Sequence, residues 1–98
     1  MQPHEIKCAV VSRMWQDGVT VNRRWADIET VASLAVPPSA FRDAVDEIEG
    51  WMLDDADCPV VKTGPGMIAL EPDEGKIRDY LERYCGSNED WPPALRDL

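Results

Sequence analysis

Histidine, lysine and long apolar runs are scarce in this sequence of 98 residues. The one histidine, His4, stands near the N-terminus with no nucleophile beside it, so we expect no enzyme of the nucleophile–base type. No apolar run approaches the ~18 residues that a membrane span needs. The first residues, Met-Gln-Pro-His-Glu, lack the basic and apolar regions of a signal peptide. These absences predict a cytoplasmic protein that is not an enzyme.

Paired metal ligands are absent as well. The three cysteines, Cys8, Cys58 and Cys85, are far apart and no CxxC pair occurs, whereas a zinc site needs four ligands, usually in close pairs. The carboxylates of residues 54–57 lack the alternation and final Glu of a calcium loop, and the Gly-rich residues 63–66 are followed by no phosphate-binding Lys. We therefore expect no metal or cofactor, and reduced, mostly buried thiols.

Positive charge is in short supply. Nineteen acids oppose ten bases, which gives a net charge of −9, and only three of the bases are lysines. This Asp-rich, Lys-poor composition resembles that of proteins from salt-loving archaea. At molar salt, charges are screened within ~3 Å and net charge does not indicate the partner. At ordinary salt, −9 argues against DNA, because DNA binding depends on neutralising phosphates.

The spacing of apolar residues predicts the order of the elements. Intervals of three and four predict four helices, over residues 3–16, 23–35, 38–50 and 74–85. Asn22 is the expected N-cap of the second helix, and Gly50 is expected to end the third. A β-branched run predicts a brief edge strand at 19–21, and two apolar runs around Gly-Pro-Gly predict a hairpin of residues 60–62 and 67–70.

The positions of the four tryptophans predict which parts of the chain form the core. Trp15, Trp25 and Trp51 fall on the apolar stripes and are expected in the core. Trp91 lies in an acidic, Pro-rich tail, where it anchors the tail either to its own domain or to a second subunit. We expect one domain over residues 1–86 and a flexible acidic tail over residues 87–98.

Residues 31–45 resemble the helix-turn-helix of bacterial and phage repressors. A small Ala35 stands at the corner between apolar Leu34 and Val36, and apolar residues follow where a second helix packs back on the first. Residues 46–51 resemble the end of a recognition helix, and residues 68–75 resemble the passage from the last wing strand to the next helix in MarR-type regulators. The resemblance implies an α+β fold of the winged helix-turn-helix type, with a three-helix core, a β-hairpin wing and an additional C-terminal helix.

The same resemblance implies double-stranded DNA as the partner and transcriptional regulation as the role. Ser39 and Arg42, early in the third helix, are expected to reach base edges in the major groove. Arg23 and Arg24, at the start of the expected second helix, and Lys62 on the hairpin are expected to bind phosphates. The alternative for these bases is an ordinary solvated surface.

Two further predictions concern protein partners. Regulators of this type commonly dimerise through terminal helices, and here residues 3–16 and 77–84 are the candidates for a homodimer. The expected exposed face of the third helix is acidic, with Asp43, Asp46, Glu47 and Glu49. The alternative function is therefore a protein-interaction module whose acidic third helix docks on a basic partner.

Overall fold

Four helices and three short strands occur in the part of the chain that the computed structural model describes, residues 1–87 with Trp91 and Leu95. The helices are α1 (Pro3–Gln16), α2 (Ile28–Ala35), α3 (Phe41–Gly50) and α4 (Glu74–Cys85). The strands are β1 (Ala26–Asp27), β2 (Val60–Thr63) and β3 (Met67–Leu70), and one-turn 3-10 helices at Pro38–Ala40 and Met52–Asp54 flank α3. The α+β class is confirmed. None of these helices is both long and apolar enough to cross a membrane.

The strands form one antiparallel sheet in the order β1-β3-β2. In the central strand, Ile68 pairs with Lys62 of β2 on one side and with Ala26 of β1 on the other. Gly64 and Gly66 have φ of 57° and 80° in the turn between β2 and β3, a region that glycine enters without steric cost. The predicted hairpin is confirmed. The edge strand predicted at 19–21 is wrong, because that segment makes only an isolated bridge to β3.

Helix α2 begins five residues later than predicted, at Ile28. The chain before it is held alongside the sheet, where the backbone N–H of Val21 donates to the Leu70 carbonyl at 2.9 Å. Asp27 then caps the helix, since its Oδ1 accepts the backbone N–H three residues further on at 2.8 Å. The N-cap predicted at Asn22 is therefore wrong.

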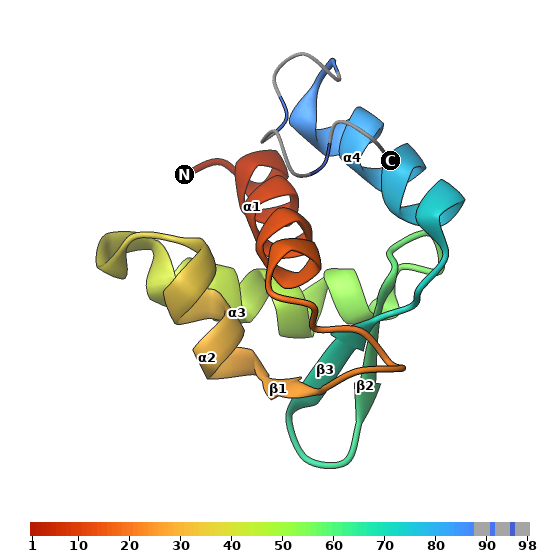
Figure 1. Cartoon of the computed structure of the whole chain (residues 1–98). Coiled ribbons are helices and arrows are strands. Elements are labelled where there is room, and N and C mark those ends of the chain that lie inside the picture. Colours follow the sequence, from red (N-terminus) through yellow and green to blue (C-terminus); the bar gives the residue numbers. More distant parts are fainter. Residues whose placement is uncertain (88–90, 92–94, 96–98) are drawn as a thin grey trace.

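Helix α1 lies between α2 and α4, with α3 crossing behind its lower end and the sheet beneath (Figure 1). Its Ile6, Val10 and Met14 are at most 2% exposed and recur at the spacing of one helix face. Ile77 and Leu81 of α4 are fully buried in the same core. The apolar faces of α1 and α4 therefore pack in the core of this chain. A homodimer through these helices stays a prediction.

Trp91 belongs to this core, whereas Trp51 lies outside it. Trp91 is 1% exposed and its Nε1–H donates to the Gly86 carbonyl at 3.2 Å, and Leu95 is also fully buried. Trp91 therefore packs on its own domain. The other residues of the predicted flexible tail, except Ser87 and Leu95, lie outside the described residues. Trp51 is 68% exposed, so its predicted place in the core is wrong. It follows the last residue of α3, and the fully buried Met52 takes the core position instead.

The cysteines also differ from the prediction. Cys8 of α1 and Cys85 of α4 form a disulfide, with their Cα atoms 5.1 Å apart. The expectation of reduced thiols is wrong for these two, because the packing of α1 on α4 brings together residues that are 77 positions apart. Cys58 is a free, buried thiol, as expected.

Candidate functional site

The start of α3 carries two of the five predicted contact residues. Ser39 lies in the 3-10 turn Pro38–Ala40 and Arg42 lies in the first turn of α3, and both are exposed. Between them, Ala40 is 3% exposed and holds the turn against the core. Ser39 and Arg42 are three residues apart, which places them within one helical turn of each other. Both side chains are therefore presented to solvent at the same place.

Arg23 and Arg24 lie in a turn and not on a helix. Their backbone N–H groups both donate to the Thr20 carbonyl, at 3.0 and 3.1 Å. The prediction that they open the second helix is wrong, because that helix starts at Ile28. The Arg23 guanidinium lies against Gly18, where a Cβ would stand 3.3 Å from Nη1. Both arginines are exposed on the loop that leads into β1.

Lys62 occupies a third position, on the outer strand β2. Its partner Ile68 separates it from Ala26 of β1, so it lies about 10 Å, two strand spacings, from the β1 edge. The structure therefore brings Ser39 together with Arg42 and Arg23 together with Arg24. Among the described residues, no hydrogen bond or ion pair joins these two pairs to each other or to Lys62.

The four basic residues among the predicted contacts form no ion pair within the described residues. Four ion pairs occur among the described residues, and their cations are Lys7, Arg13, Lys76 and Arg83. Within that part of the chain, no acid pairs with Arg23, Arg24, Arg42 or Lys62. Arg78 of α4 likewise has no acid partner there. Exposed, unpaired bases are available to an anion in a chain whose net charge is −9.

The acids of α3 differ in how far they are exposed. Asp43, Asp46 and Glu49 are exposed beside Arg42. Glu47 is only 9% exposed and forms an ion pair with Lys7 of α1, so its predicted place on the exposed face is wrong. The helical spacing places Glu47 on the buried face of α3, next to Ala44 and Ile48.

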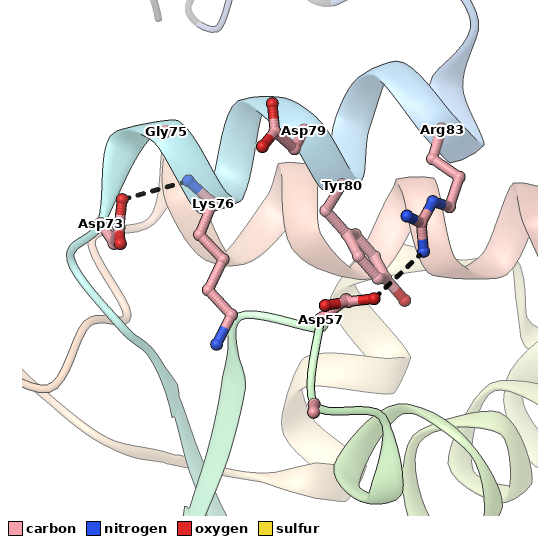
Figure 2. A pocket seen from close by; sticks show the side chains of 8 residues that line it. Asp57, Asp73, Gly75, Lys76, Asp79, Tyr80 and Arg83 are labelled. Carbon is pink, nitrogen blue, oxygen red and sulfur yellow. Dashed lines mark hydrogen bonds and ion pairs between the residues drawn. The ribbon is translucent and has the colours of Figure 1, made fainter.

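A polar hollow of about 510 Å³ lies between α4 and the loop before β2 (Figure 2). Its charged residues are largely matched within the molecule: Lys76 Nζ lies 3.2 Å from Glu71 Oε1, and Arg83 Nη1 lies 3.7 Å from Asp57 Oδ2. Sequence reasoning did not find this hollow, because its walls come from segments that are distant in sequence. No group of three or more His, Cys, Asp or Glu side chains that could hold a metal ion occurs among the described residues.

The Tyr80 ring lines the same hollow behind Asp57 and Arg83 (Figure 2). Its hydroxyl is buried and has no hydrogen-bond partner among the described residues. Burial is the main cause that raises the pKa of Tyr80 above its ordinary value, and the nearby Cys58 thiol adds to the effect. Burial also raises the pKa of Cys58. Both groups therefore stay neutral at pH 7, so neither Tyr80 in the hollow nor Cys58 behind it is an anionic nucleophile or metal ligand at that pH.

Comparison of the chain with known protein families, with curated proteins and with solved structures finds no match. The likeness to MarR-type regulators consequently stands on the sequence pattern of residues 31–50 and 68–75.

Proposed function

We propose that this chain is a winged-helix DNA-binding protein, a small transcriptional regulator. The observation that carries the proposal is the arrangement of α2, α3 and the hairpin. Two helices meet at the short corner Val36–Pro37, and the hairpin that follows α3 completes a sheet with β1. This is the element order of winged-helix DNA-binding domains, in which the helix after the corner enters the major groove.

The side chains at the start of α3 suit that role. Arg42 is exposed and pairs with no acid of the described residues, and an arginine binds guanine O6 and N7 with two hydrogen bonds. Ser39, within one turn of Arg42, is a second donor for a base edge or a phosphate. Asp43 and Asp46 on the same helix oppose the phosphates, so we expect binding to be weak.

The other unpaired bases supply phosphate contacts. Arg23, Arg24 and Lys62 give three cations for the backbone. Each neutralised phosphate contributes about −0.9 to the slope of log K against log salt. Three contacts therefore predict a slope of about −2.7 for the wild-type protein.

The direct test is a fluorescence-anisotropy titration with a labelled pool of random-sequence duplexes, followed by selection of the bound fraction. The Arg23→Ala/Arg24→Ala variant should bind all duplexes more weakly and reduce the salt slope by about 2. Arg42→Ala should flatten the preference for the selected sequence by about 1–3 kcal/mol.

The matched control is Arg78→Ala, which removes an equally unpaired arginine from α4. It should change neither the selected sequence nor, beyond a few tenths, the salt slope. Failure of the folded protein to bind any duplex between about 20 mM and 3 M salt, the range over which screening changes most, would overturn the proposal.

The exposed acids of α3 favour a second candidate, a protein-interaction module that docks this helix on a basic partner. Asp43 and Asp46 lie where a DNA reader would meet phosphates. An Asp43→Asn change separates the two functions. It should tighten DNA binding if α3 enters the groove, and should weaken capture of a basic partner if α3 docks on protein.

A further inference from the structure

A second hollow, of about 400 Å³, opens where α3 ends and faces α4. Trp51 forms one wall and Tyr84 another, and the remaining lining residues are Lys7, Gly50, Asp54 and Asp55. The hollow lies nine residues along the chain from Arg42, about 14 Å at the helical rise. It is therefore at the opposite end of α3 from the proposed DNA contacts, and the inference below does not rest on DNA binding.

The backbone of Trp51 is hydrogen-bonded, whereas its side chain is largely exposed. Its N–H donates to the Glu47 carbonyl at 3.1 Å and its carbonyl accepts from the Asp54 N–H at 3.2 Å. The side chain is nonetheless 68% exposed, and no ring or cation contact of its indole occurs among the described residues. An exposed tryptophan on an ordered backbone is the residue type most enriched in binding hot spots, and its ring face attracts cations.

The opposite wall is rigid. The Tyr84 ring lies against Tyr80, with centroids 4.6 Å apart, and Lys7 Nζ is 5.3 Å from its centroid. Lys7 also forms the ion pair with Glu47. Since Glu47 already balances the charge of Lys7, the cation in this wall does not repel a second one as a free lysine would.

Two carboxylates, those of Asp54 and Asp55, also line the hollow. Asp54 is exposed and has no ion-pair or hydrogen-bond partner for its side chain within the described residues. Asp55 Oδ1 accepts the backbone N–H of Asp57 at 2.9 Å, which orients its carboxylate without neutralising it. Lys7 is paired with Glu47, and Arg83, 6.0 Å from the centroid of the Tyr84 ring, is paired with Asp57. Asp54 and Asp55 therefore remain without an ion-pair partner among the described residues, next to an exposed indole face.

From this combination we infer that the hollow binds the guanidinium group of an arginine in a basic segment of a partner protein. A guanidinium is planar, so it stacks on the Trp51 indole while its N–H fork donates to Asp54. Hydrogen bonds from arginine to a carboxylate are charge-assisted and can be bidentate. A lysine ammonium satisfies the charge and not the stacked geometry, and a planar uncharged group satisfies the geometry and not the charge.

The test uses the whole chain and three fluorescent peptides, identical except for one central residue: arginine, lysine or citrulline. Citrulline keeps the shape of arginine and removes its charge. We expect saturable binding of the arginine peptide, weaker binding of the lysine peptide and the weakest binding of the citrulline peptide. Trp51→Ala and Asp54→Asn should each weaken the arginine peptide by about tenfold, a loss within the range of one cation–π contact or one charge-assisted bond.

Three control variants make the result specific. Val21→Ala removes another exposed apolar side chain, and Asp79→Asn removes a charge of α4 that lies on the other hollow. Both should bind the arginine peptide within twofold of wild type. Asp43→Asn/Asp46→Asn should do so too, whereas loss of binding in this variant alone would support docking on the α3 face and would overturn the present inference.

Other outcomes also overturn it. Equal binding of the arginine and citrulline peptides would remove the role of charge, and equal binding by wild type and Trp51→Ala would remove the role of the indole. A dimer in sedimentation that Trp51→Ala dissociates would show that a second copy of this chain occupies the hollow, and not a basic partner. Because Trp51 is exposed, Trp51→Ala should leave the unfolding midpoint unchanged, so lost binding does not reflect lost fold.

Discussion

Individual carboxylates have different roles in this acidic chain, according to their surroundings. Asp27 caps α2, accepting the backbone N–H and the hydroxyl of Thr30 at 2.8 and 2.7 Å. Those two hydrogen bonds lower the pKa of Asp27 from its ordinary 3.8. Glu47 is buried against Lys7, while Asp43, one turn earlier in α3, is exposed. The same residue type is thus a cap, a buried ion or a surface charge.

The lowered pKa of Asp27 predicts a pH dependence of stability. Its ionised form stabilises the fold fully above the unfolded value of 3.8, and this contribution is lost as the pH falls through the lower pKa of the folded state. Asp27→Asn keeps the capping oxygen and does not titrate. The difference in unfolding midpoint between wild type and Asp27→Asn should be constant near neutral pH and shrink below pH 3.8. A difference that is the same at both ends of the range would contradict the assignment.

At the scale of elements, α1 is the helix on which the others are assembled. It packs on α2, α3, α4 and β3. Two specific links reinforce that packing: the ion pair of Lys7 with Glu47 of α3, and the disulfide of Cys8 with Cys85 of α4. Both links start from the first turns of α1, so the position of α3 and of the Trp51 hollow depends on this helix.

Removal of Glu47 tests the link between α1 and α3. Glu47→Ala leaves Lys7 poorly solvated and unpaired, and should lower the free energy of unfolding by about 2 kcal/mol, between the values for exposed and fully buried pairs. The Lys7→Met/Glu47→Leu double variant should recover most of that loss, because no buried charge remains. Urea denaturation measures both.

The control for this pair is Arg13→Met. It breaks the pair of Arg13 with Asp17, whose side chains are 42% and 25% exposed, and should cost less than about 1 kcal/mol. If Glu47→Ala costs no more than this control, the ion pair does not secure α3 to α1.

For the whole molecule, the disulfide and the buried Trp91 close the chain upon itself. Cys8 and Cys85 join the first helix to the last across 77 residues. Trp91 and Leu95 then add apolar side chains from beyond α4 to the common core. A chain of 98 residues has a modest core, so these connections between its ends contribute to stability out of proportion to their number.

Reduction of the disulfide should therefore destabilise the protein markedly. For a loop of this length the chain-entropy model predicts a loss of about 4.5 kcal/mol. Urea unfolding of wild type with and without a phosphine reductant measures the loss. The Cys8→Ser/Cys85→Ser variant should match the reduced protein and be insensitive to the reductant. An unchanged midpoint on reduction of wild type would show that the helices hold their places without the bond.

Local patterns in the sequence were enough to predict most of the elements. The three- and four-residue spacing of apolar side chains identified all four helices, and Gly-Pro-Gly between apolar runs identified the hairpin. The order of these elements also indicated the exposed start of α3, with Ser39 and Arg42. These features depend on residues that are close in sequence, so periodicity and turn chemistry are sufficient for them.

The remaining features depend on residues that are far apart, and only the tertiary structure decided them. Helix α2 starts at Ile28 because the preceding backbone bonds to β3, although Asp27 with Glu29 was a local signal for that start. The Cys8–Cys85 bond, the inward turn of Glu47 and the exposure of Trp51 follow from how α1, α3 and α4 pack. An apolar or acidic side chain carries no local sign of which surface it meets, because burial depends on its partners and not on its neighbours in sequence.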